Sequence, residues 1–283
     1  MHINSRITAL ALSIVSMQVV ACDNHDLAYL RLSSGHWQVW LTDALGRCHQ
    51  IVTSDPVDKT RVSWSKERAR LLVNDNEGGL SWCTLQGDCH ALEIPATVML
   101  DAAVSPDGTD VAFSRNSTQT WDNNDLWLLN TGKSSLKKIT AMPGVEQRPA
   151  WHRDGNRLVF SSGSRKTGYH VWQYDLGSQA IEQLSSGKFN QLDPVYGPNN
   201  GVLYSANPDG DYDIWWTDGK TLSPIKRIPG YDAQPSWSDR FKRIAFFHMQ
   251  GGEKAIYTMD IHGGQLNKLT ADDIQARSPA WLN

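Results

Sequence analysis

The stretch Pro149–Phe160, which reads Pro-Ala-Trp-His-Arg-Asp-Gly-Asn-Arg-Leu-Val-Phe, is the clearest copy of a phrase that returns six times along the chain. The copies align on one aromatic or apolar position, which is Trp64, Val104, Trp151, Tyr196, Trp237 and Trp281. Neighbouring copies are therefore 40, 47, 45, 41 and 44 residues apart. Self-similarity at such a period indicates a fold built from repeated supersecondary units, so the chain is interpreted unit by unit.

Each unit contains several short runs that are typical of β-strands. A second column of aromatic residues lies downstream of the first, at Trp40, Trp82, Trp127, Trp172, Trp215 and Tyr257. Strand-like runs rich in Val, Ile, Phe, Tyr and Trp alternate with Asp-Gly and Asn-Asn turns, which is the pattern of β-hairpins. No stretch shows a helical period. Four strands in a period of this length predict an all-β fold, a β-propeller with four antiparallel strands per blade.

The two ends of the repeat region predict how the ring closes. The region opens at Leu27 with the second, third and fourth strands of a blade, and it finishes with a lone first-strand phrase at Ser278–Trp281. These pieces complete one another, so we expect a six-bladed propeller over residues 27–283 that is closed by the C-terminal strand. Such closure pairs two free sheet edges that would otherwise invite aggregation.

The N-terminus predicts export. Residues 1–21 have a basic start at Arg6, an apolar core and a small residue, Ala21, at the end, which is typical of a secretory signal. The tetrad Val19-Val20-Ala21-Cys22 resembles a bacterial lipobox, which implies lipidation at Cys22 and a short tether over residues 22–26. The alternative is an ordinary signal peptide followed by a stray cysteine. With a lipid anchor the chain would face the periplasm, and Asp23 favours the inner membrane.

Composition and motifs exclude several classes of function. A formal charge of −3 offers no basic footprint, so we expect no nucleic-acid partner. The sequence contains no His-Glu-x-x-His, no Gly-x-Ser-x-Gly and no glycine-rich phosphate loop. We therefore expect a monomeric, non-enzymatic propeller without a cofactor.

Three cysteines remain beyond Cys22. Cys83 and Cys89 flank a short turn, so they are expected to face each other across a hairpin, and an oxidising compartment permits the disulfide. Cys48 occupies the position equivalent to Cys89 one unit earlier and is left free in this interpretation. Three buried thiols are the alternative, and Cys48 could also find a partner.

Several phrases resemble one known family. Residues 149–155 (Pro-Ala-Trp-His-Arg-Asp-Gly), residues 103–108 (Ala-Val-Ser-Pro-Asp-Gly) and residues 213–219 (Asp-Ile-Trp-Trp-Thr-Asp-Gly) resemble the repeats of TolB-type, WD-repeat-like propellers. The resemblance covers residues 27–283 and implies the fold. The TolB protein itself is periplasmic and carries an additional N-terminal α/β domain, so only its propeller half is comparable. The repeated phrases also have a complete structural explanation in turns and packing.

One set of equivalent positions is a candidate binding site. Three residues before each first-strand anchor stand Arg61, Asp101, Arg148, Asp193, Gln234 and Ser278. A ring would bring these side chains together near the mouth of the central channel, with cations and anions alternating over the first four. They would form either a self-contained set of salt bridges or a ligand mouth. For a mouth, we expect it to be framed by the loops at residues 115–124, 164–169 and 249–254, and Trp121 is the candidate aromatic anchor for a partner.

One further loop has the composition of a metal site. Asp209, Asp211 and Asp213 alternate as oxygen donors and could surround Ca²⁺, but the same loop is an ordinary acidic turn of a TolB-type repeat. The function expected from the whole sequence is an envelope lipoprotein that acts as a scaffold or assembly factor for a periplasmic or membrane-associated protein. The alternative is a propeller enzyme or carbohydrate-binding protein that uses the central funnel.

Overall fold

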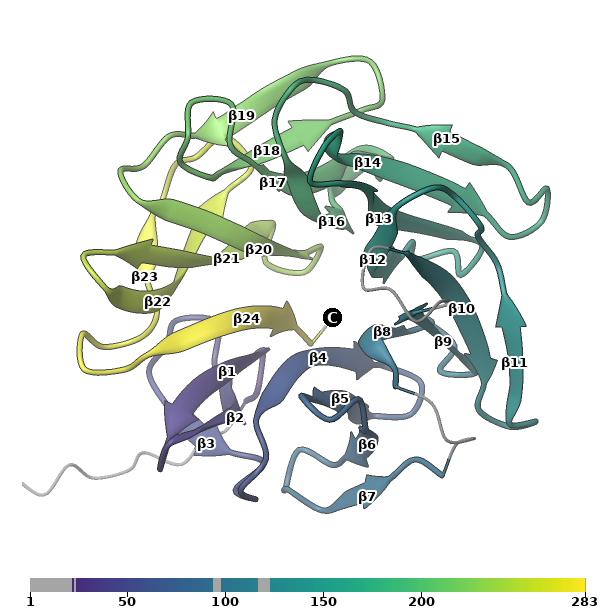
Figure 1. The fold of residues 1–283 in the computed structure, drawn as a ribbon. Helices are drawn as coiled ribbons and strands as arrows, with labels where there is room; N and C mark the ends of the chain where they lie inside the picture. The colour runs from purple at the N-terminus through teal and green to yellow at the C-terminus, as the bar shows by residue number, and fades with distance from the viewer. Residues whose placement is uncertain (1–21, 23, 94–97, 117–122, 283) are drawn as a thin grey trace, which may run out of the picture.

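The structure, a computed structural model, is a ring of β-sheets (Figure 1) around a central cavity. It describes residue 22 and residues 24–93, 98–116 and 123–282. The regular elements in these ranges are the strands β1–β24 and one short 3-10 helix, η1 (Pro198–Asn200). Among the described residues, no helix is long and apolar enough to cross a membrane. The expected all-β propeller is confirmed as a fold class.

Four of the sheets contain four antiparallel strands each. The first runs in the order β24 (Ala276–Trp281), β1 (Leu27–Ser33), β2 (His36–Thr42) and β3 (His49–Ile51). The second is β4 (Lys59–Ser65), β5 (Arg70–Asp75), β6 (Leu80–Cys83) and β7 (Cys89–Ala91). Another is β16 (Gln191–Tyr196), β17 (Val202–Ala206), β18 (Asp213–Thr217) and β19 (Leu222–Lys226). The last is β20 (Tyr231–Ser238), β21 (Arg243–Gln250), β22 (Glu253–Asp260) and β23 (Asn267–Lys268).

The remaining strands form one eight-stranded sheet, so the prediction of six separate four-stranded blades is wrong. Its strands are β8 (Leu100–Val104), β9 (Asp110–Asn116), β10 (Asn124–Asn130), β11 (Ser135–Lys138), β12 (Val145–Trp151), β13 (Arg157–Ser164), β14 (Gly168–Asp175) and β15 (Ile181–Gln183). A parallel bridge between Asn124 and Val145 joins β10 to β12 and merges two repeats. Hydrogen bonds therefore divide the ring into four four-stranded blades and this larger sheet, because β12 starts beside the beginning of β10.

The C-terminal strand lies in the first sheet. β24 pairs antiparallel with β1, with Leu27 opposite Trp281 and Ala28 opposite Ala280. In Figure 1 the arrow of β24 ends close to the centre of the ring. The Trp281 side chain is 5% exposed and packs in a cluster with residues from both ends of the chain, including Leu27, Tyr29 and Ile256. The last strand thus contributes to the core between the first and last sheets.

The core lies between neighbouring sheets, where the aromatic columns pack as the sequence predicts. Trp82 and Phe113 belong to one cluster between the second sheet and the strands β8–β10. Trp151 donates its indole Nε1–H to the Ala103 carbonyl oxygen at 2.9 Å, which ties β12 to β8. Burial of large side chains between sheets is the main stabilising term for such a ring.

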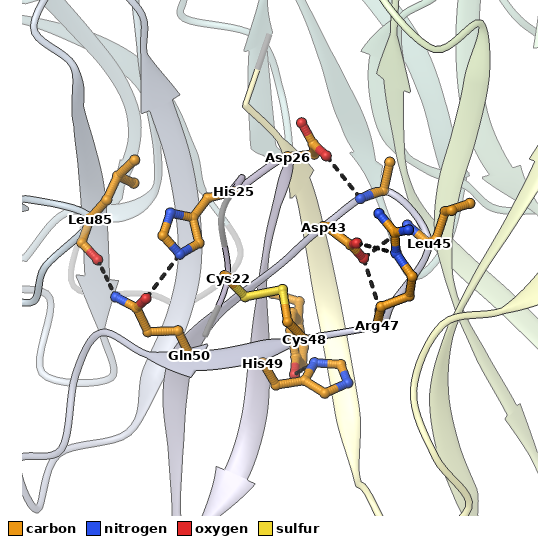
Figure 2. The surroundings of a disulfide bond; sticks show 12 residues. Cys22, His25, Asp26, Asp43, Leu45, Arg47, Cys48, His49, Gln50 and Leu85 are labelled. Atoms are coloured by element: carbon orange, nitrogen blue, oxygen red, sulfur yellow. Dashed lines mark hydrogen bonds and ion pairs between the residues drawn. A yellow bond between two sulfur atoms is a disulfide. The ribbon is translucent and has the colours of Figure 1, made fainter. Parts of the chain in front are cut away.

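The first disulfide joins Cys22 to Cys48, with 5.4 Å between the two Cα atoms (Figure 2). The prediction that Cys48 is free is therefore wrong. Lipidation at Cys22 stays a prediction, and the disulfide bears on it because a sulfur atom bonded to another sulfur cannot carry the thioether of a lipid anchor. The sequence could not show this pairing, since the two residues are 26 positions apart and meet only when the chain folds.

The second disulfide joins Cys83 to Cys89 across the turn between β6 and β7. It is the pair that the hairpin pattern favours. The two residues stand directly opposite each other in the antiparallel register. Together the two bonds engage all four cysteines of the chain.

Candidate functional site

A bulge in each innermost strand shapes the wall of the channel. In every strand that lies closest to the centre, the register with the next strand shifts beside the predicted ring position. Five ring residues adopt a left-handed backbone with φ between 52° and 57°: Asp101, Arg148, Asp193, Gln234 and Ser278. A bulge leaves one residue out of the ladder and redirects its side chain. Here the redirected side chains meet around the channel axis.

Ion pairs connect three of these ring residues. Arg148 Nε lies 3.0 Å from Asp101 Oδ1 and 3.5 Å from Asp193 Oδ1. The side chains of Arg148, Asp101 and Asp193 retain 29%, 21% and 14% of their exposure, so the cluster is largely shielded from water. One arginine thus bridges two carboxylates that come from repeats on either side of it.

Arg61 is held differently from Arg148. Its Nη1 donates to the Asp101 carbonyl oxygen at 2.6 Å, and its Nη2 donates to the Pro149 carbonyl oxygen at 2.9 Å. Its guanidinium therefore spans β4, β8 and β12 through main-chain acceptors. The cluster therefore contains two arginines and two carboxylates, so its net charge is close to zero.

The pKa shifts of the two arginines follow from this arrangement. Burial lowers the pKa of Arg61 to about 10, against the opposing attraction of Asp101, so the side chain stays charged at neutral pH. The carboxylate of Asp101, helped by that of Asp193, raises the pKa of Arg148 above its usual value. Neither arginine can act as a base near neutrality. The cluster is suited to holding charge in place and not to transferring protons.

The ring continues with uncharged residues. Gln234 Oε1 accepts the backbone N–H of Ser278 at 2.9 Å and the Ser278 hydroxyl at 3.1 Å. The Gln234 backbone N–H in turn donates to Ser205 Oγ at 3.2 Å. The polar contacts thus extend from β24 through β20 to β17, and they connect three sheets.

A central cavity of about 610 Å³ extends from this ring, which forms its floor, toward the turns that follow the innermost strands. Its floor includes Arg61, Arg148 and Asp193, and its wall includes Trp64, Trp151 and Trp281. Its outer end is lined by residues of the turns that follow the innermost strands: Lys66, Glu67, Pro106, Arg153 and Asp239. The cavity therefore opens on the side of these turns.

Two of the three segments predicted to frame the mouth do not line the cavity. Residues 164–169 span the turn from the end of β13 to the start of β14, residues 249–254 span the turn from β21 to β22, and none of them lines the cavity. Residues 115–124 connect β9 to β10, and Trp121 lies outside the described residues. The structure thus does not bring residues 164–169 and 249–254 together with the ring residues in this cavity.

Sequence reasoning missed the cavity wall and rim. The wall tryptophans belong to the aromatic columns that were assigned to packing, yet they also face the cavity. The rim contains an ion pair between Arg153 Nη1 and Asp239 Oδ2 at 3.2 Å, from turns 86 residues apart. No local signal identifies that pair, since only closure of the ring brings the two turns together.

The carboxylates of the candidate calcium loop make contacts with neighbouring protein groups. Asp209 Oδ2 lies 2.5 Å from Arg227 Nη1, and Asp213 Oδ1 accepts the Ile228 N–H at 3.4 Å. Burial, reinforced by the neighbouring Asp211 and Asp209, raises the pKa of Asp213 against the Ile228 hydrogen bond and the positive charge of Arg227. In the described part of the chain, no group of three or more His, Cys, Asp or Glu residues is arranged to hold a metal ion.

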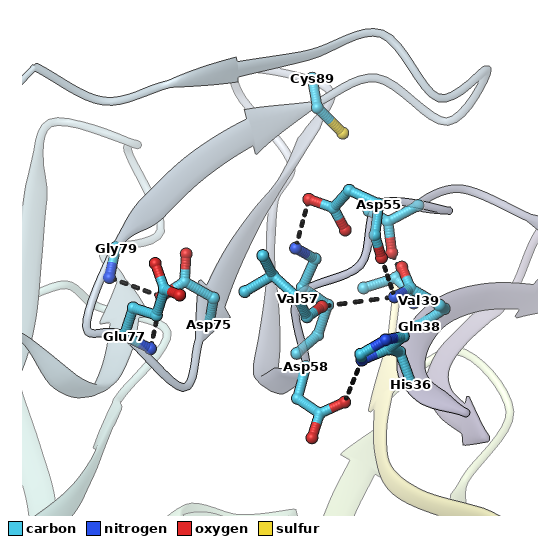
Figure 3. Close-up of polar contacts among 12 residues, drawn as sticks. His36, Gln38, Val39, Asp55, Val57, Asp58, Asp75, Glu77, Gly79 and Cys89 are labelled. Carbon is cyan, nitrogen blue, oxygen red and sulfur yellow. Dashed lines mark hydrogen bonds and ion pairs between the residues drawn. The ribbon is translucent and has the colours of Figure 1, made fainter. Parts of the chain in front are cut away.

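A second hollow, of about 230 Å³, is lined by residues of the first two sheets, including Cys83 and Cys89, and Figure 3 shows polar contacts around it. The nearly buried Lys59 donates to Asp55 Oδ2 at 2.7 Å, and Asp75 accepts the Gly79 and Glu77 backbone N–H groups at 2.7 and 3.0 Å. Gln38 Nε2 donates to the carbonyl oxygens of Asp55 and Val57 at 2.7 and 3.3 Å. These contacts fix turns and account for the charges without a ligand.

Comparison with known proteins gives a consistent picture. Residues 96–283, more than half of the chain, match the family model described as "TolB beta propeller domain". The chain is 26% identical over 125 residues to "Tol-Pal system protein TolB" of Nitratidesulfovibrio vulgaris, a match that covers 43% of this chain and 28% of that protein. It is 25% identical over 180 residues to "Protein TolB homolog" of Chlorobium luteolum, covering 62% of this chain and 40% of the relative.

A solved structure shares the fold. "Crystal structure of TolB from Acinetobacter baumannii" superposes with a TM-score of 0.78 at 16% identity, over 91% of this chain and 66% of that one. Identity at this level shows the fold alone. The chain spans less than half the length of the two curated relatives described above, so their activities as whole proteins do not transfer directly.

Proposed function

Because the chain belongs to the TolB β-propeller family, we propose that it is a non-catalytic interaction module of the bacterial envelope that binds a protein partner through its central cavity. The name of one relative, "Tol-Pal system protein TolB", supports a role in an envelope assembly of that kind. The sequence features of a secretory signal support a periplasmic location. The observation that carries the proposal is the cavity itself, with its charged floor and tryptophan wall.

The cavity has the properties of a protein-binding site. Interface hot spots are enriched in Trp and Arg that lie in desolvated pockets. Here Trp64, Trp151 and Trp281 offer apolar and indole surface, while Arg61 and Arg148 fix charge at the floor. A volume of about 610 Å³ is of the size that holds a few side chains or a short extended peptide segment.

The chemistry of the lining residues favours binding over catalysis. The described residues that line the cavity include no histidine and no cysteine. The Asp193 and Asp239 carboxylates are ion-paired with Arg148 and Arg153 respectively. General acid-base or nucleophilic catalysis requires a group with a pKa near neutrality or an activated nucleophile close to a base. The described lining offers no such pair.

Site-specific photocrosslinking in the periplasm tests which face binds the partner. A photoreactive residue replaces Lys66 at the cavity rim, and a matched one replaces Arg165 in the β13–β14 loop on the opposite face. We expect one dominant protein adduct from position 66 and none from position 165. An adduct from position 165 alone would place the interaction on the other face, and an adduct from a third probe at Trp121 alone would contradict binding at the cavity rim. Adducts with glycans or small molecules at position 66 would point to a different ligand class.

A further inference from the structure

The chemical fate of Cys22 is decided by where the fold places it. We propose that Cys22 is a structural disulfide partner that pins the start of the exported chain to the propeller, and that its sulfur is not a lipid attachment site. Cys48, its partner, lies in the connection between β2 and β3 and is 7% exposed. The inference concerns how the protein is held in the envelope and is independent of the function of the cavity.

The segment that follows Cys22 is docked on the protein. The Asp26 backbone N–H donates to the Thr42 carbonyl oxygen at 3.0 Å, and the Asp26 carbonyl oxygen accepts the Leu282 N–H at 2.8 Å. Its carboxylate accepts the Ala44 N–H at 3.0 Å and lies 3.1 Å from Arg240 Nη1. Asp26 is 7% exposed, and its backbone N–H, its carbonyl oxygen and both carboxylate oxygens have partners.

His25 continues the docked segment toward the cysteine. Its Nε2 lies 2.9 Å from Gln50 Oε1, and Gln50 Nε2 donates to the Leu85 carbonyl oxygen at 2.9 Å (Figure 2). Cys22 is thus guided toward the β2–β3 connection by contacts at residues 25 and 26. A flexible tether between a lipid and the propeller would leave these polar groups free to contact water.

Disulfide formation and lipidation compete for one atom. A lipid anchor on cysteine needs a thioether bond at Sγ, and the disulfide uses the same Sγ. In the oxidation, the Cys22 and Cys48 thiols lose two protons and two electrons, and the disulfide of a protein oxidase of the compartment accepts them and becomes a dithiol. If Cys22 were lipidated instead, Cys48 would remain as an unpaired thiol in a chain whose other two cysteines are bonded.

Cleavage between Ala21 and Cys22 is compatible with a disulfide at Cys22 as well as with lipidation. The small residue Ala21 precedes Cys22, and a small residue before the cut is the requirement of an ordinary signal peptidase. The resemblance of the tetrad to a lipobox therefore does not by itself require a lipid. An ordinary cut would leave Cys22 as the first residue of the mature chain with its thiol free to pair.

The proposal has a consequence for the cavity. Arg240, which contacts Asp26, adjoins Asp239 at the cavity rim. The start of the mature chain and the open end of the cavity therefore lie on the same face of the ring. A lipid on a tether of a few residues would hold that face against the bilayer, whereas a disulfide leaves it open to the periplasm.

The test is thiol-blocked, non-reduced peptide mapping of the full-length chain, exported with its own signal in a Gram-negative host. We expect the N-terminal peptide that begins at Cys22 to be linked to the Cys48 peptide, with no alkylated cysteine. In a Cys48→Ala variant, Cys22 should change from fully blocked to fully alkylatable. In the matched Cys89→Ala variant, only Cys83 should become alkylatable.

A diacylglycerol-modified Cys22 peptide together with alkylated Cys48 in the wild-type chain would overturn the proposal. Two free thiols at these positions in the oxidised protein would do the same. The wild-type map alone decides the question if the Cys48→Ala variant fails to accumulate.

Discussion

Glu146 shows how a single buried carboxyl group couples this fold to pH. Its side chain is fully buried in β12, where it contacts the Thr140 hydroxyl and accepts the Met142 N–H at 3.1 Å. Burial raises the pKa of Glu146 to about 7, against these hydrogen bonds. Gln191 occupies the equivalent position in β16 and contacts Ser185 in the same way, so a neutral amide satisfies this geometry.

The Glu146→Gln variant should therefore lose part of the pH dependence of stability. The folded state holds a proton that the unfolded chain releases near pH 4.5, so the wild-type free energy of unfolding falls as pH rises from about 4.5 to about 7. The fall attributable to Glu146 is up to about 3 kcal/mol. Urea denaturation across this pH range measures it. The exposed Glu182→Gln variant is the control and should keep the wild-type slope.

Arg148 is the residue on which the cavity floor depends. An Arg148→Met variant leaves the Asp101 and Asp193 carboxylates without their shared cation. We expect a loss of about 2 kcal/mol in the free energy of unfolding, because a shielded carboxylate without a partner is costly. Chemical denaturation at neutral pH measures the loss, and an additional Asp193→Asn change should restore part of it.

Lys242→Met is the matched control for Arg148→Met. Lys242 also has a left-handed backbone, with φ 53°, and also faces a carboxylate, Asp239 at 3.5 Å. Its side chain is 72% exposed, so we expect little change in stability. Equal effects of the two substitutions would mean that backbone strain, and not the buried charge cluster, explains the result.

At the scale of the element, the six-residue strand β24 contributes to a sheet, to the ring of polar contacts and to the core. It pairs with β1, supplies Ser278 to the ring of polar contacts and places Trp281 between the first and last sheets. A strand that serves three purposes is difficult to replace by a neighbouring segment. The position of Trp281 makes the contribution of this strand measurable.

The Trp281→Ala variant should lower the free energy of unfolding by about 3 kcal/mol, since it removes a large buried side chain from a packed cluster. Thermal or chemical denaturation measures the effect. Leu45→Ala, at a side chain that is 63% exposed, is the control and should be close to neutral. A stability of Trp281→Ala equal to that of the wild type would show that β24 does not contribute to the core.

At the scale of the whole molecule, the ring creates contacts between turns that are remote in sequence. The Arg153–Asp239 pair crosses the cavity rim, with side chains 64% and 47% exposed. Exposed pairs of this kind contribute about 0–1 kcal/mol to stability. Their position beside the opening makes them more suitable for recognition than for holding the fold together.

An Arg153→Ala variant should therefore keep the wild-type melting temperature and weaken capture of the partner. A loss of about tenfold is expected if the side chain contacts the partner at the rim. Crosslinking yield from position 66 in the Arg153→Ala background measures it. Arg165→Ala, on the opposite face, should leave the yield unchanged.

Much of the architecture was predictable because it is encoded locally. The aromatic columns, the hairpin turns and the Cys83–Cys89 pair depend on residues close together in one repeat. The positions of Arg61, Arg148 and Asp193 around the channel follow from equivalence between repeats. The contacts of these side chains could not be predicted from equivalence between repeats. Arg61 contacts main-chain carbonyl groups, whereas Arg148 contacts carboxylates.

The amino-acid sequence by itself determined that this protein is a β-propeller of repeated four-stranded units, because period-two strands and tight turns are properties of short segments. Only the tertiary structure decided that two of those units share one sheet through Asn124 and Val145, and that Cys22 meets Cys48. It also decided that the cavity opens at Lys66 and Arg153 and not at residues 164–169 or 249–254. Each of these outcomes joins segments far apart in the chain, and their contact depends on the closed geometry of the ring, which no local pattern specifies.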